Sequence, residues 1–235
     1  MSLDVSACTY RSPEALVHAV TLLAANNGTL RKLRVHDCFF YADTAFITAV
    51  LAAAPLLRVL EADVRCAPAD AGHLLRNERL RVREMDVHLK EEDEEDEEFT
   101  HADVMNVRAL GETLAACSHP SLTSIKLQFA AVGDFEAADA IADAALALRL
   151  SSVTFESCWL CDESAHALAR MLRGGSLTEL FLFGGSTLLE WDDAAAQLLA
   201  DALRASTTIA SLCLFEVGVF HKPAVIHALV AHPTR

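Results

Sequence analysis

The chain has 235 residues, of which 53% are hydrophobic, 22% charged and 6% aromatic. This composition supports a sizeable core built mainly from Ala, Leu and Val, and it excludes an intrinsically disordered chain. The formal net charge of −14 argues against a general nucleic-acid binder, which needs a basic surface to neutralise phosphates.

Short apolar segments recur along the whole chain with one internal spacing. Segment 30–38 has apolar residues at its first, fourth and sixth positions, and segment 150–158 repeats the pattern. The middle residues of the copies are Leu3, Leu33, Leu60, Met85, Ile125, Val153, Leu180 and Leu212. Seven intervals separate them, and only the one that contains the acidic run 91–98 is much longer than the rest. The spacing predicts a repeat of about 28 residues with an acidic insertion at about 90–100.

Helical segments are predicted between the apolar segments. Ser12, Pro13 and Glu14 form a helix start, with a cap, a first-turn proline and an early acid. A second helix is capped by Asp162 or Ser164 and ends at a pair of glycines, and a third starts at the acidic pair 192–193. Each unit therefore consists of a short strand, a turn and a helix, and such units must stack to bury their apolar faces.

This pattern resembles the leucine-rich repeat family, in particular its long-repeat, intracellular branch, which includes ribonuclease inhibitor. The resemblance extends from Leu3 to about Pro233. It implies an α/β fold: a curved, right-handed β-α solenoid of about eight repeats, with a parallel sheet on the concave face and helices on the convex face. We expect residues 1–235 to form one such domain.

The sequence predicts an intracellular, cytoplasmic protein. The seven cysteines are odd in number and mostly scattered, which fits reduced thiols better than a disulfide framework. The first residues lack the basic start and apolar run of a signal peptide. The longest apolar stretch, 45–57, is too short to span a bilayer.

No motif in the sequence indicates catalysis, a metal or a cofactor. Cys158 and Cys161 have the spacing of a redox pair, but the acids that follow them would raise a thiol pKa. We therefore interpret both cysteines as structural. The acidic run 91–98 is typical of a solvated loop, with attraction of a basic protein as its functional alternative. We expect no catalytic residue, no cofactor and no metal.

Strand alternation places a second set of side chains on the concave face. In each apolar segment the residues between the core positions point to the opposite side of the sheet. The predicted concave residues of the first six units include Lys32, Arg34, His36, Glu61, Asp63, Glu84, Asp86, Ser124, Lys126, Gln128, Ser152, Thr154 and Glu156. The last two units place Phe181, Phe183 and Phe215 on this face, where the earlier units carry polar residues.

The phenylalanines and their acidic neighbours are the predicted partner-binding site, because aromatic residues dominate interface energetics. The site consists of Glu179, Phe181, Phe183, Phe215 and Glu216. Two alternatives stay open: the rings pack under the end of the chain itself or in a homodimer, or a shift of strand register points them the other way.

These features favour a non-catalytic scaffold that binds a protein partner through the concave face. The resemblance implies a basic protein as one kind of partner. The net charge argues against a nucleic-acid partner, and the short apolar stretches argue against a membrane. Two alternatives are a regulator of an enzyme such as a small GTPase and a self-associating fragment of a larger repeat protein. Self-association through the solenoid ends is expected where no polar repeat caps them.

Overall fold

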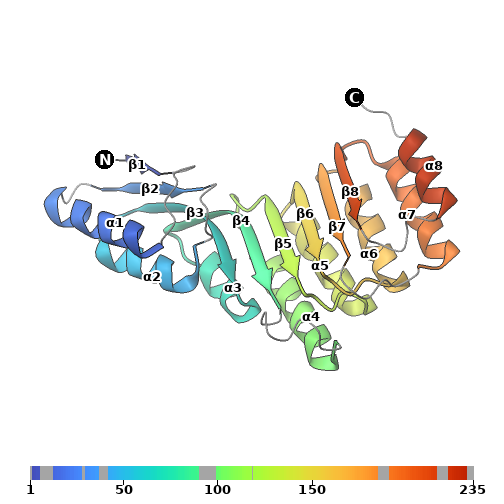
Figure 1. Cartoon of the computed structure of the whole chain (residues 1–235), viewed down its shortest axis with the longest axis horizontal. Helices are drawn as coiled ribbons and strands as arrows, with labels where there is room; N and C mark the ends of the chain where they lie inside the picture. Colours follow the sequence, from blue (N-terminus) through green and yellow to red (C-terminus); the bar gives the residue numbers. More distant parts are fainter. Residues whose placement is uncertain are drawn as a thin grey trace.

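The fold is α/β: in the residues that the structure describes, eight parallel strands alternate with eight helices. The computed structural model describes residues 2–5, 13–27, 30–36, 42–89, 99–117, 119–184, 191–215 and 222–231. The strands form a single sheet whose spatial order is the order of the chain, from β1 at one edge to β8 at the other. The sheet follows a curve, and the helices cover one of its two faces (Figure 1). We call the opposite face the inner face.

Each strand is followed by a helix that returns the chain to the start of the next strand. The strands are β1 (Ser2–Asp4), β2 (Lys32–Val35), β3 (Val59–Cys66), β4 (Leu80–His88), β5 (Ser124–Gln128), β6 (Ser152–Glu156), β7 (Glu179–Phe183) and β8 (Ser211–Phe215). The helices are α1 (Pro13–Asn27), α2 (Thr44–Ala53), α3 (Pro68–Leu75), α4 (His101–Ala115), α5 (Phe135–Ala147), α6 (Asp162–Arg173), α7 (Asp193–Ala205) and α8 (Pro223–Ala231).

The predicted repeat positions align in the sheet with one exception. Leu3, Leu33 and Leu60 pair in register across β1–β3, and Met85, Ile125, Val153, Leu180 and Leu212 do so across β4–β8. Between β3 and β4 the register shifts: Leu60 lies opposite Leu80, and Met85 lies opposite Val64. The shift leaves Arg83 and Glu84 opposite Asp63 alone, which is a β-bulge.

The core lies between the sheet and the helices. The strand side chains that point toward the helices are almost all fully buried, among them Leu33, Leu60, Leu127, Phe155 and Leu182. The contacts form one continuous cluster that runs from the first repeat to the last. A solenoid in which each unit packs on its neighbours has this kind of core.

The helix starts follow the sequence signals closely. Helix α1 begins at Pro13, and α7 is capped by Asp192, whose carboxylate accepts a hydrogen bond from the backbone N–H of Ala195. The predicted cap of helix α6, Asp162 or Ser164, is wrong: the helix begins at Asp162 and its cap is Cys161, whose backbone N–H donates to the Ser164 hydroxyl at 3.1 Å.

The acidic run 91–98 lies outside the described residues, between the end of β4 and the start of α4. Among the residues that the structure describes, no helix is both long and apolar enough to cross a membrane.

Candidate functional site

The inner face is a grid of side chains, because the strands of its C-terminal part pair in one continuous register. One row runs from Lys126 through Thr154 and Phe181 to Cys213. The next row runs from Gln128 through Glu156 and Phe183 to Phe215. Neighbouring strands lie about 4.8 Å apart, so each side chain can contact the next one in its row.

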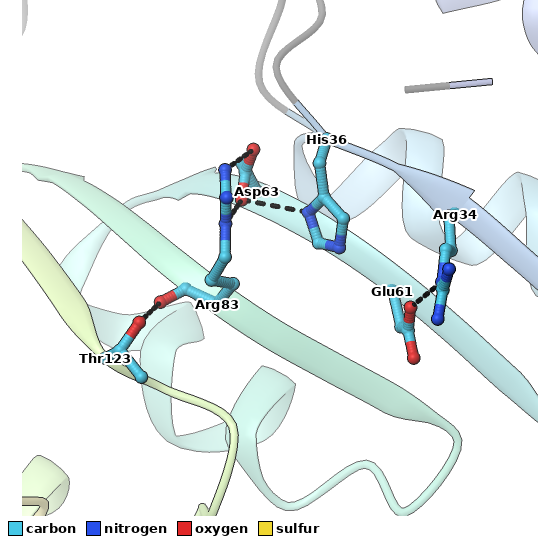
Figure 2. Close-up of polar contacts among 6 residues, drawn as sticks. All are labelled: Arg34, His36, Glu61, Asp63, Arg83 and Thr123. Carbon is cyan, nitrogen blue, oxygen red and sulfur yellow. Dashed lines mark hydrogen bonds and ion pairs between the residues drawn. The ribbon is translucent and has the colours of Figure 1, made fainter. Parts of the chain in front are cut away.

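In the N-terminal half of the inner face, charged residues pair across neighbouring strands (Figure 2). Glu61 on β3 accepts from Arg34 and from Lys32, both on β2. Burial alone would raise the pKa of the Glu61 carboxyl, but the hydrogen bonds from these two cations outweigh that effect and lower it. Asp63 contacts His36 Nδ1 at 3.0 Å and Arg83 Nη2 at 3.3 Å, from the strands on either side.

Asp86 on β4 is the most buried charged group of the inner face. Its side chain is fully buried, and both carboxylate oxygens accept from Gln128 Nε2, at 2.9 and 3.0 Å. Arg65 Nε on β3 donates to the same carboxylate at 3.2 Å, and His88 Nε2 lies 3.6 Å from it. One point of the sheet therefore brings together four side chains from β3, β4 and β5, which are those of Arg65, Asp86, His88 and Gln128.

In the N-terminal half of the inner face, most polar side chains already form hydrogen bonds or ion pairs with one another. The sequence pattern predicts which face these residues occupy, and the structure places them there. It also shows a property that the pattern does not predict, which is that four of these side chains are buried: Asp63, Asp86, Gln128 and Ser152. Long side chains bridge the short distance between strands and cover their shorter neighbours, so a partner would have to displace existing bonds.

Sequence reasoning missed Arg65, Arg83 and His88, which hold the two buried aspartates. The β-bulge brings Arg83 beside Asp63. The sequence gives one sign of this bulge: the interval between Leu60 and Met85 is only 25 residues, which marks an irregular repeat.

The structure brings three of the predicted site residues together at the other end of the inner face. Phe181 and Phe183 stack with ring centroids 6.2 Å apart and an angle of 5° between the rings. Phe183 and Phe215 are 6.5 Å apart at an angle of 51°. Phe215 is 55% exposed, and the other two rings are half-buried. We call these three residues the aromatic patch.

The two predicted acids differ in what the structure says of them. Glu179 is exposed at the start of β7, two residues before Phe181, and no ion pair to it occurs in the described parts of the chain. Glu216 lies outside the described residues. Glu156 lies beside Phe183 in the sheet and forms an ion pair with Lys126.

Cys158 and Cys161, which have the spacing of a redox pair, are poorly suited to redox chemistry. Burial raises the pKa of Cys158 to about 12, and its thiol donates to the Leu127 carbonyl oxygen at 3.3 Å. Burial and a hydrogen bond to the Glu163 carboxylate raise the pKa of Cys161 to about 11. Thiolates are the reactive form, so these values disfavour attack by either sulfur. Within the described ranges, no group of three or more His, Cys, Asp or Glu side chains could hold a metal ion.

Comparisons with known proteins give little guidance. No family model matches the chain, and no curated protein does. Among solved structures, the chain is similar to the apo form of a "putative deoxyribose-phosphate aldolase" from Toxoplasma gondii. The identity is 13%, the match covers 99% of this chain and 84% of that chain, and the TM-score is 0.26. A TM-score this low carries no argument about the fold or the activity of this chain.

The prediction of a non-catalytic interaction scaffold nevertheless needs correction. The similar structure bears the name of an enzyme, whereas the prediction was of a protein without catalysis. We do not carry the scaffold hypothesis forward. The chemistry of the aromatic patch and Glu179 indicates which chemical group this end of the inner face would bind.

Proposed function

We propose that the aromatic patch and Glu179 form a recognition site for the guanidinium group of an arginine side chain. The observation that carries this proposal is the pair of parallel rings, Phe181 and Phe183, next to a carboxylate with no ion pair in the described residues. Both features lie where the ionic contacts of the inner face end.

The chemistry of the site favours arginine over other cations. A guanidinium is planar, so it stacks on an aromatic ring while its N–H groups donate to a carboxylate in a fork. Phe181 and Glu179 are two residues apart on one strand and therefore share the inner face. An ammonium group is more strongly hydrated and cannot make the planar contact, so lysine should bind less well.

The charge of the chain supports the same ligand. The formal net charge of −14 attracts cations over a distance set by the ionic strength. The acids of the N-terminal half are neutralised by Arg34, Lys32, Arg83 and Arg65, whereas Glu179 is exposed. Long-range attraction would therefore end in a specific contact at the C-terminal end of the inner face.

We further propose that the chain is a leucine-rich-repeat-type solenoid of an intracellular protein. The regular spacing of the repeat residues supports this, as does the arrangement of one parallel sheet with all described helices on one side. Five cysteines in the described residues are free thiols, which supports a reducing compartment.

The test is binding of a short glycine-flanked arginine peptide, compared with the same peptide carrying citrulline. Citrulline keeps the planar shape and loses the charge. We expect the arginine peptide to bind better and the double variant Phe181→Leu/Phe183→Leu to weaken it by about 3- to 30-fold, since cation–π contacts contribute about 0.5–2 kcal/mol. Glu179→Gln should weaken it by a similar factor.

Phe135→Leu is the matched control, because Phe135 is 50% exposed at the start of α5, on the helical side of the molecule. This variant should bind like the wild type. Equal affinity for the arginine and citrulline peptides would contradict the proposal. So would binding that survives loss of both rings and disappears only with added salt, since it would then be unspecific attraction to an acidic protein.

A further inference from the structure

Among the described strands, β8 lies at the edge of the sheet. Strand β8 pairs with β7 on one side, and no strand in the described residues pairs with its other side. Its five residues, Ser211–Phe215, include no charge and no proline. Edge strands usually carry such features to prevent pairing with another chain. Strand β1, the opposite edge, has only three residues and carries Asp4, 3.6 Å from Arg34.

The core beneath this edge is also incompletely covered. Leu180 and Val153 are fully buried in their strands, whereas Leu212 at the same position of β8 is half-buried. The neighbouring helix α8 exposes three apolar side chains. These are Ile226, Leu229 and Val230, with exposed fractions of 44%, 36% and 82%. In the described part of the chain, no further strand or helix packs against the outer side of β8 or α8.

The charge distribution indicates what can cover this end. The chain has a formal net charge of −14, so most contacts between two copies would bring acids together. Strand β8 and helix α8 contain no acidic residue, and the only ionisable groups in them are Cys213 and His227. This end is therefore a surface on which a second copy can dock without repulsion between carboxylates.

We propose that two copies of the chain form a dimer in which their β8 strands pair antiparallel, with α8 of one copy beside α8 of the other. An antiparallel pairing about a two-fold axis closes after two copies, whereas a head-to-tail contact of β8 with β1 would continue into a filament. The short, charged β1 is a poor match for β8, so the symmetric contact is favoured.

The symmetry of the dimer places Cys213, the middle residue of β8, opposite its own copy. Residues opposite each other in antiparallel strands have Cα atoms about 4.5–5.5 Å apart, which lies within the span of a disulfide of about 4.4–6.8 Å. Cys213 is half-buried and free in the single chain. The same pairing places Phe215 of each copy opposite Ser211 of the other, so the two aromatic patches become neighbours on one continuous inner face.

The experiment measures the mass of the full chain by size-exclusion chromatography with light scattering, across a range of concentrations. We expect twice the chain mass of 25.4 kDa. Mild oxidation should convert this species to a covalent dimer in the wild type and not in Cys213→Ser. The double variant Ile226→Glu/Val230→Glu should be a monomer, because it places four carboxylates at the contact. Met105→Glu is the matched control, since Met105 is 45% exposed on α4, and it should remain a dimer.

Circular dichroism of each variant separates loss of pairing from loss of folding. A monomeric mass of the wild type at all concentrations would overturn the proposal. A dimer that persists in Ile226→Glu/Val230→Glu and gives no covalent product through Cys213 would also overturn it, as would masses that grow beyond a dimer. The arginine-peptide assay on the monomeric variant tests the aromatic patch separately, because Glu179, Phe181 and Phe183 are unchanged in it.

Discussion

The buried carboxylate of Asp86 provides the sharpest test of how the inner face is built. In the variant Asp86→Leu, Gln128 loses the acceptor of both of its hydrogen bonds to this carboxylate and stays buried. Leaving a buried polar group without its partner costs about 1–3 kcal/mol. Arg65 also loses its partner, but its side chain is 45% exposed and water can replace the contact, so this loss adds less than about 1 kcal/mol.

We therefore expect Asp86→Leu to lower the free energy of unfolding by about 1–4 kcal/mol. Urea unfolding followed by circular dichroism measures this as a lower midpoint with an unchanged slope. Asp86→Asn keeps one acceptor oxygen for Gln128 and should lose less. Glu179→Gln is an exposed control on the same face, and its effect should stay within about 0.5 kcal/mol.

A double-mutant cycle tests the physical reason directly. In Asp86→Leu/Gln128→Leu both polar partners are gone, so no buried amide is left unsatisfied, and the double variant should be more stable than Asp86→Leu alone. A double variant as unstable as the sum of the two single variants would show that the two residues act independently. The loss in Asp86→Leu would then come from poor packing of the leucine and not from an unsatisfied Gln128.

Three further predictions concern other parts of the fold. Gly111→Ala should destabilise the chain by about 1–3 kcal/mol in thermal or urea unfolding, because a Cβ at this position of α4 would lie 2.5 Å from the backbone carbonyl carbon of Ala140 in α5. Cys158 and Cys161 should react with iodoacetamide near neutral pH more slowly than an ordinary thiol, since their pKa values are raised to about 12 and about 11. Burial lowers the pKa of His119 below its ordinary 6.5, so the unfolded chain binds this proton more readily. Stability should therefore fall as the pH drops below 6.5, and His119→Gln should reduce that dependence in urea titrations at several pH values.

The repeat itself could be predicted from the sequence because its signal is local and recurs eight times. Residues such as Leu33, Val153 and Leu180 occupy one core position in every unit, and the register of the sheet follows from them. Helix starts at Pro13 and Asp192 follow from capping chemistry within a few residues. Both kinds of signal depend on neighbours along the chain.

The features that the sequence did not predict depend on neighbours across the sheet. Alternation places Asp86 on the inner face, but its burial results from Arg65 and Gln128, which lie 21 and 42 residues away in the chain. The shift of strand register between β3 and β4 follows from the short third repeat. The shorter spacing between repeats shows that a repeat is irregular, but it does not show which residue forms the bulge. The mutual contacts of the three phenylalanines depend on the regular register of β7 and β8, so that part of the candidate site could be predicted.

The two halves of the inner face differ in what a ligand must give up to bind. In the N-terminal half, a cation would compete with Arg34 or Arg83 for a carboxylate that is already paired, so it would gain one ion pair by breaking another. In the C-terminal half, the aromatic patch offers ring surface, and Glu179 is exposed to solvent. Desolvation of phenylalanine is favourable, whereas desolvation of a paired charge is costly. Binding energy should therefore concentrate at β7 and β8, the end of the sheet at which a second copy would double the available aromatic surface.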